Sequence, residues 1–313
     1  MHRWFIFNPY SKYIQKSGCL TKFNYGILVS GTLGLSCLRF INNNNRICFV
    51  FTDNRSIDII DFCIKKNIPY FIGNPRNGKA ADFINNYSTD VILSINYIYI
   101  INSDIIRLSK KYAINFHGSL LPKYRGRTPH VWSIINNEKE TGITAHRITE
   151  ECDKGEIVHQ EKIPILPDTT GGNILEQFIN LYPVIIQKVI SMIENEQVVF
   201  VEQDETKATW FGKRNPDDGE INWNWQKERI YNWVRAQSNP YPGAFTYYKN
   251  SKVIIHKIEY SDMGFDFEQE NGTILLGGSR PIIKTPNGAV KLTTIETATV
   301  IIFNKEEKLH ERH

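Results

Sequence analysis

Two polar stretches of this sequence contain residue types that could carry out chemistry together. The first, NFHGSLLPKYRGRTP, occupies residues 115–129 and directly follows an apolar segment. If that segment is a strand, Asn115 and His117 point to the same face, because side chains alternate along a strand. An amide beside an imidazole suits acyl-group transfer, since the amide can donate to a developing oxyanion while the imidazole moves a proton.

The second stretch, TGITAHRITEECDKGEIVHQ at residues 141–160, places Asp153 in a CDKG turn between two strand-like runs. If the turn folds back over the sheet edge, Asp153 can hold the His117 imidazole in one tautomer and raise its basicity. Asn115, His117 and Asp153 would then resemble a triad whose nucleophile comes from the substrate. Two alternatives stay open: a histidine on a buried strand is often a hydrogen-bonded core residue, and Asp before Lys-Gly is often only a turn.

Other candidate motifs are weaker. GTLG at residues 31–34 lies between a strand-like run and a helical one, but it lacks the G-x-G-x-x-G pattern of dinucleotide sites. The five cysteines form no CxxC pair and no metal-like spacing, so we expect buried thiols in a reducing compartment and no metal site. They are Cys19, Cys37, Cys48, Cys63 and Cys152.

Strand-like and helical patterns alternate before and through these stretches. Apolar runs at residues 26–31, 46–53, 68–73, 90–97 and 113–119 predict strands, and segments 33–41, 56–66, 81–87 and 103–112 predict helices, the last with Ser103 as its N-cap. This alternation predicts an α/β, Rossmann-like, mostly parallel sheet with helices on both faces. Ligands of such sheets bind beyond the carboxyl ends of the strands, where residues 115–129 would lie.

A second unit is predicted after a long amphipathic helix at about residues 172–195. Short strand-like runs with Gly, Pro and Asn turns lie between residues 244 and 297, after a helix at 227–237, and predict a small mainly-β, OB-like barrel. We therefore expect an N-terminal extension (1–24), a catalytic domain (25–205) and a C-terminal β-rich domain (206–313). Trp223, Trp225 and Trp233 would build the core of that last domain or a dimer contact.

Composition narrows the class of protein. The 313 residues are 41% hydrophobic and 22% charged, with a net charge of +4. Positive charge that is modest and scattered argues against a dedicated nucleic-acid binder. The start of the chain lacks a signal-peptide pattern and no apolar run reaches the length of a membrane span, so we expect a cytoplasmic protein without a membrane partner.

The two polar stretches resemble the signature of formyltransferases that use N10-formyltetrahydrofolate. This family includes methionyl-tRNA formyltransferase, glycinamide ribonucleotide formyltransferase and the sugar-nucleotide N-formyltransferases. FGKRNPDDGEINW and VRAQSNPYPGAF resemble the C-terminal domain of the first and last of these, so the resemblance covers about residues 25–260. Gly118 departs from relatives that carry another small residue or proline there, which predicts a change in loop flexibility.

The resemblance implies roles for individual residues. Asn115 and protonated His117 would stabilise the oxyanion that forms when a substrate amine attacks the formyl carbon, and Asp153 would assist proton removal. Folate, the formyl donor, would lie along residues 93–97 and 150–155, with contacts from Leu93, Ile95, Tyr97, Glu150 and Gly155. The acceptor would contact Tyr97, Ser119, Lys123, Tyr124, Arg125 and Arg127, each of which could instead be an ordinary surface residue.

The identity of the acceptor amine is open among three readings. A nucleotide-linked amino sugar is favoured, and we expect a dTDP-amino-dideoxysugar for O-antigen or lipopolysaccharide synthesis and a homodimeric enzyme. Transfer RNA is the first alternative, but TDNRSIDIIDFCIKKNIP leaves no room for the basic loop that enters the acceptor stem, and no basic cluster supplies phosphate contacts. A formyltetrahydrofolate hydrolase is the second, although residues 1–24 are too short for the regulatory-type domain usual in such enzymes.

Overall fold

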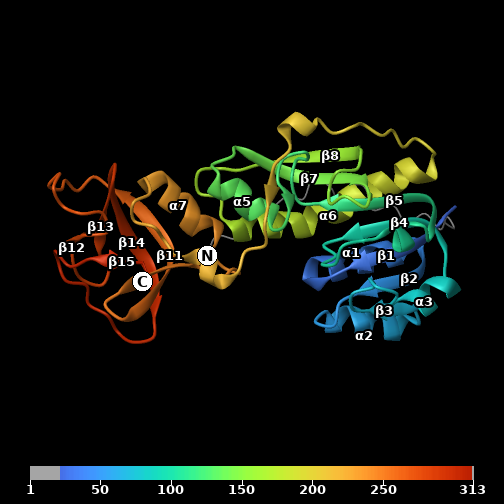
Figure 1. Cartoon of the computed structure of the whole chain (residues 1–313), viewed down its shortest axis with the longest axis horizontal. Coiled ribbons are helices and arrows are strands. Elements are labelled where there is room, and N and C mark those ends of the chain that lie inside the picture. Colours follow the sequence, from blue (N-terminus) through green and yellow to red (C-terminus); the bar gives the residue numbers. More distant parts are fainter. Residues whose placement is uncertain (1–21, 312–313) are drawn as a thin grey trace, which may run out of the picture.

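The computed structural model describes residues 22–311 (Figure 1). The predicted extension therefore lies outside the described residues except for its last three, of which Asn24 begins the first strand. Cys19 also lies outside them. Among the other cysteines, Cys37 and Cys63 are buried as expected, whereas Cys152 is exposed. The picture shows an elongated molecule, with the α/β part at one end and the β-rich part at the other.

The first part is built on a seven-stranded sheet that follows the order β3-β2-β1-β4-β5-β7-β8. The strands from β3 to β5 run parallel, and β7 and β8 are antiparallel to their neighbours. The prediction of a mostly parallel, Rossmann-like sheet is confirmed. Its strands are β1 (Asn24–Val29), β2 (Arg46–Thr52), β3 (Tyr70–Ile72), β4 (Thr89–Ile95), β5 (Ser109–His117), β7 (Glu140–Arg147) and β8 (Ile157–Pro164).

Helices cover both faces of this sheet because its central strands are apolar on both sides. In β1, Ile27 and Val29 belong to the core that includes buried residues of α1, α2, α5 and α6, whereas Leu28 faces a second core with α3 and α4. The helices are α1 (Gly31–Asn44), α2 (Ile57–Lys66), α3 (Ala81–Asn86), α4 (Ser103–Ile106), α5 (Pro129–Ile135) and α6 (Gly171–Glu194).

The prediction of a helix over residues 103–112 is wrong for most of its length. Only Ser103–Ile106 is helical, its N-cap is Asn102, and β5 already begins at Ser109. The pairing of Thr89 with Ser109 explains the difference, because the backbone hydrogen bonds of a neighbouring strand outweigh the weak helix preference of so short a segment. The longer β5 carries the chain directly to Asn115 and His117.

The second part is a six-stranded antiparallel sheet in the order β12-β13-β14-β11-β10-β15. A bridge between Thr273 and Lys308 joins the two edges and nearly closes the sheet, which confirms the barrel-like prediction. Trp223 and Trp233 are buried in the hydrophobic core, and Trp225 packs against that core, as expected. The elements are α7 (Lys227–Ala236), β10 (Ala244–Tyr248), β11 (Ser251–Ser261), β12 (Ile274–Leu276), β13 (Ile282–Thr285), β14 (Gly288–Thr297) and β15 (Leu309–His310).

A connection without long elements joins the two parts. It contains η2 (Glu205–Lys207), β9 (Trp210–Phe211) and η3 (Pro216–Gly219). β9 pairs with β6 (Arg125–Gly126), a two-residue strand between β5 and α5. The boundary predicted between residues 205 and 206 falls within this connection.

The two parts are in close contact at α5 and the start of α6. A Cβ on Gly171 would lie 2.2 Å from Ala236 O, and one on Gly172 would lie 2.2 Å from Asn239 O, so only glycine allows this approach. His130 in α5 is buried, and its Nε2 lies 2.5 Å from Tyr241 Oη. Burial, together with the charge of nearby His117, lowers the pKa of His130 to about 4.

The stability of the protein should therefore depend on His130 between pH 6.5 and 4. The pKa of His130 is lower in the folded state, so the unfolded chain binds a proton first as the pH falls. The resulting loss of stability is complete near pH 4 and amounts to on the order of 3 kcal/mol. We expect urea unfolding at pH 7 and pH 4.5 to show a smaller pH effect in His130→Gln than in the wild type. Parallel pH dependences would contradict this assignment.

Candidate active site

The candidate site is built first at the carboxyl end of β5. Asn115 and His117 lie on the same face of this strand, as its alternation predicts. Antiparallel pairing with β7 sets Asn115 opposite His146 and His117 opposite Thr144. Asn115 is half-buried and His117 is buried, so the strand presents both polar side chains in a largely protected position.

The connection between β7 and β8 brings Asp153 to the same place. Asp153 is buried, with Oδ1 3.7 Å from His117 Nδ1 and 3.5 Å from His146 Nε2. Its other oxygen, Oδ2, accepts a hydrogen bond of 2.9 Å from the backbone N–H of Gly126. The structure thus brings together Asn115, His117 and Asp153, which the sequence predicts as a trio.

The position of the ring fixes the tautomer of His117. Its Nε2 lies 2.8 Å from the backbone oxygen of Tyr124, which can only accept, so Nε2 carries a hydrogen. Nδ1 then faces Asp153 at 3.7 Å, longer than a hydrogen bond. Nδ1 is therefore the ring nitrogen that is placed to exchange a proton with a group entering beside Asp153.

Asp153 stays ionised although it is buried. Burial by itself would raise the pKa of this carboxyl group. The electrostatic influence of His117 and the hydrogen bond from the Gly126 N–H outweigh this effect and hold the pKa of Asp153 well below its usual range. The site therefore contains a carboxylate that can stabilise a protonated imidazole or accept a proton from an ammonium group.

His146 is a member of the site that sequence reasoning missed. Its Nδ1 lies 2.8 Å from Arg147 O and therefore carries a hydrogen, so in the neutral ring Nε2 accepts from Asn115 Nδ2 at 3.1 Å. This contact turns the Asn115 amide so that its second N–H remains free to donate. The alternation in GITAHRIT indicates which face of its strand His146 occupies. This signal could have identified His146 only if the strand order had been known, because only the β5–β7 pairing places His146 opposite Asn115.

Cys152, which precedes Asp153, is poorly suited to act as a protein nucleophile. Although the Cys152 residue as a whole is exposed, its Sγ lies 3.3 Å from Asp153 Oδ2, and partial loss of solvent around the thiol followed by the Asp153 charge raises its pKa to about 12. The thiolate needed for nucleophilic attack is therefore scarce at neutral pH.

A Cβ on Gly118 would lie 2.8 Å from the Phe178 ring, so close packing against α6, rather than loop flexibility, explains glycine here.

The residues predicted to contact the acceptor differ in their burial and in their hydrogen-bond partners. Ser119 is buried and donates to Lys123 O, while Tyr124 Oη donates to Glu138 at 2.9 Å and Lys123 Nζ lies 3.2 Å from the same carboxylate. Arg127 is exposed and donates from Nη1 to Ile98 O at 3.2 Å. Arg125 is fully buried among protein partners. A role of these residues in acceptor binding stays a prediction.

The predicted folate contacts also differ in access. The side chains of Leu93 and Ile95 are fully buried in the core, so only their backbone could meet a ligand. Tyr97 Oη is buried without a hydrogen-bond partner among the described residues, which leaves it a polar group for a ligand at the end of β4. Glu150 is exposed, and Gly155 is buried where a Cβ would lie 1.9 Å from Arg147 O. These contacts stay predictions as well.

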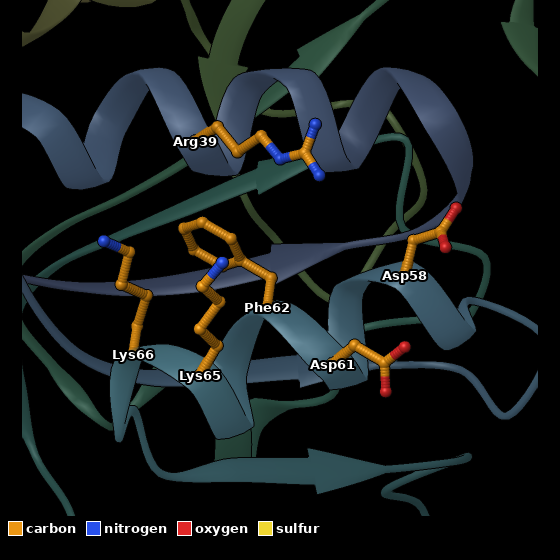
Figure 2. A pocket seen from close by; sticks show the side chains of 6 residues that line it. All are labelled: Arg39, Asp58, Asp61, Phe62, Lys65 and Lys66. Atoms are coloured by element: carbon orange, nitrogen blue, oxygen red, sulfur yellow. The ribbon is translucent and has the colours of Figure 1, made fainter.

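A surface hollow of about 480 Å³ lies elsewhere, between α1 and α2 (Figure 2). No member of the trio lines it, and its side chains carry both charges and remain open to solvent. We therefore assign the site by its chemistry rather than by this hollow. The lining residues are Arg39, Asp58, Asp61, Phe62, Lys65 and Lys66.

Within residues 22–311, no group of three or more His, Cys, Asp or Glu side chains could hold a metal ion. None of the helices described for the chain is long and apolar enough to cross a membrane.

Comparison with known proteins gives matches over most of the chain. Residues 46–190 match the family described as formyl transferase, and residues 213–308 match its C-terminal domain. The bifunctional polymyxin resistance protein ArnA of Wigglesworthia glossinidia brevipalpis is 37% identical over 254 residues, which are 78% of this chain and 38% of that protein. The chain thus spans well under half the length of this relative.

Solved structures share the fold at lower identity. WlaRD, a sugar 3N-formyl transferase solved in the presence of dTDP and 5-N-formyl-THF, is 22% identical with a TM-score of 0.65, over 89% of this chain and 98% of that one. The N-formyltransferase of Helicobacter canadensis, in complex with folinic acid and dTDP-3-aminofucose, is 19% identical with a TM-score of 0.65, over 86% and 98%. Methionyl-tRNA formyltransferase of Clostridium thermocellum is 20% identical with a TM-score of 0.53, over 76% and 93%.

The contact of His146 with Asn115 can be tested by stability. In His146→Leu the Asn115 amide loses its buried acceptor, which should lower the free energy of unfolding by about 1–3 kcal/mol. His146→Gln offers an acceptor at a similar reach and should lose less. Urea unfolding of the two variants checks this, and an equal loss in both would show that the hydrogen bond is not what His146 contributes.

Proposed function

The chain belongs to the formyl transferase family, and from this premise we propose that it moves a formyl group from N10-formyltetrahydrofolate to the amine of a nucleotide-linked amino sugar. The observation that carries the proposal is the meeting of Asn115, His117 and Asp153 at one sheet edge. This arrangement supplies an oxyanion donor, an imidazole and a carboxylate but leaves the nucleophile to the substrate, as amine formylation requires.

The residues support a simple course of reaction. The substrate amine attacks the formyl carbon, so that a new C–N bond forms and a tetrahedral centre with an oxyanion develops. The free N–H of Asn115 donates to the oxyanion, and protonated His117 adds positive charge nearby. The ammonium proton passes to the Asp153–His117 pair and then to the departing N10 nitrogen, whose bond to the formyl carbon breaks.

The site fits a folate-type donor at the end of β4. The unpartnered Tyr97 hydroxyl lies after this strand, one strand away from Asn115 and His117. Folate compounds bound to WlaRD and to the Helicobacter canadensis enzyme support the same choice of donor for this chain.

An amino sugar is favoured over transfer RNA by a local feature of the fold. β2 ends at Thr52 and α2 begins at Ile57, so only four residues connect them. This is too short for an extended basic loop that could enter an acceptor stem. The dTDP compounds in two matched structures support a dTDP-amino-dideoxysugar, and we extend the proposal to O-antigen or lipopolysaccharide synthesis by a cytoplasmic homodimer.

Acceptor specificity should be visible in one assay. We expect tetrahydrofolate release from N10-formyltetrahydrofolate with one or more dTDP- or UDP-linked amino sugars, and little change in rate between 50 and 200 mM salt. A nucleic-acid substrate would instead show a steep fall in affinity with salt. Turnover only with charged initiator tRNA would favour the tRNA reading, and release without any amine would favour a hydrolase.

The trio should control kcat. His117→Asn and Asp153→Asn remove proton transfer while keeping polar side chains of similar size, so we expect kcat to fall by about 10²–10⁴. His256→Asn and Asp104→Asn change a half-buried histidine and an exposed aspartate outside the site and serve as controls. Near-full activity of either trio variant in steady-state assays would refute the role given to that residue.

A further inference from the structure

The connection between the two parts passes directly beside the candidate site. β9 lies parallel to β6, with Arg125 paired to Trp210 and Gly126 paired to Phe211. Arg125 N–H donates to Thr209 O at 2.8 Å, and Arg127 N–H donates to Phe211 O at 3.0 Å. The loop after His117 is therefore bound to the connection through its backbone.

Gln203 links this connection to the turn that carries Asp153. Its Nε2 donates to the backbone oxygens of Asp153 at 2.8 Å and Gly155 at 2.7 Å. Its Oε1 accepts from Arg125 Nη2 at 2.7 Å and Nε at 3.3 Å. One amide thus uses both N–H donors on the turn and its oxygen on Arg125.

Arg125 is held by protein partners on the other side. Its side chain is fully buried, and its guanidinium forms two parallel contacts with Glu205, Nη1 to Oε2 at 2.9 Å and Nη2 to Oε1 at 2.5 Å. The guanidinium also lies 5.0 Å from the centroid of the Trp210 ring. Such a forked arrangement requires Arg and leaves no free edge for a ligand phosphate.

The turn needs support because of its backbone. Asp153 has φ 55°, in the left-handed region that is unfavourable for a non-glycine residue. Gly126, the neighbour of Arg125, donates to the Asp153 side chain. A shift of this turn would therefore move the carboxylate away from His117 and His146 together.

We propose that Arg125 and Gln203 form a brace that positions Asp153 for catalysis, with Glu205 holding the outer side of Arg125. Arg125 is then a positioning residue and not a contact for the diphosphate of the acceptor. The kinetic consequence rests on the proposed formyl transfer, whereas the structural consequence, a fixed turn at residues 150–156, does not.

The kinetic test separates bracing from phosphate binding. We expect Gln203→Glu, which keeps an acceptor oxygen for Arg125 but loses both N–H donors, to lower kcat by about tenfold or more with KM within about twofold, because misplacing a catalytic group by 1 Å can cost 10²-fold. Arg125→Lys should resemble Arg125→Met, since Lys cannot form the fork. A diphosphate contact would instead raise the KM of the nucleotide sugar and be largely restored by Lys.

Two matched variants act as controls. Glu202→Gln changes an exposed neighbour of Gln203 and should leave both constants unchanged. Arg127→Met changes an exposed arginine two residues from Arg125. Because the sequence predicts that Arg127 contacts the acceptor, this variant should raise the KM of that substrate rather than lower kcat alone. Unchanged kcat in both Gln203→Glu and Arg125→Met would overturn the brace.

An activity-independent measurement keeps the proposal separate from the proposed function. Hydrogen–deuterium exchange of peptides covering residues 148–157 should be faster in Gln203→Glu than in the wild type and unchanged in Glu202→Gln. Unaltered exchange in Gln203→Glu would overturn the brace even if the wild type has no activity with amino sugars. If Arg125→Met does not fold, the test rests on Gln203→Glu and Gln203→Met, because Gln203 is only half-buried.

Discussion

An ionised carboxylate in a buried position is stable only when nearby charges and hydrogen bonds replace the water that it has lost. Asp153 meets this condition through the His117 ring and a backbone N–H, with the His146 ring 3.5 Å from Oδ1, and each comes from a different part of the chain. β5 supplies His117, β7 supplies His146, and the short strand β6 supplies Gly126. The sheet order and the connection after α6 both serve to bring these groups around one side chain.

Much of this arrangement could be predicted from sequence because it follows from local rules. Alternation along one strand placed Asn115 and His117 together, and the repeated strand–helix pattern located their strand at a ligand-binding edge. The short turns after residue 244 indicated the barrel, since antiparallel strands need only a few connecting residues. Each of these inferences depends on residues close to one another in the chain.

What the sequence did not predict depends on pairing between distant residues. His146 joins the site through strand register, and Arg125 is buried because residues 203 and 205, almost eighty positions later, surround its guanidinium. A charged residue in a polar loop has no local signal for such burial. The same holds for Leu93 and Ile95, whose side chains face the core because helices cover that side of β4.

The path of the connection also sets an order of assembly. Every strand of the seven-stranded sheet is contained in residues 24–164, and this sheet can form as soon as α6 has been synthesised to cover it. The contacts of Gln203, Thr209 and Phe211 become possible only when those residues have left the ribosome. Because N-terminal domains generally fold first during synthesis, the sheet can be complete while the Asp153 turn is still unsupported. We therefore expect the nascent chain to acquire its sheet before the geometry around Asp153 is fixed.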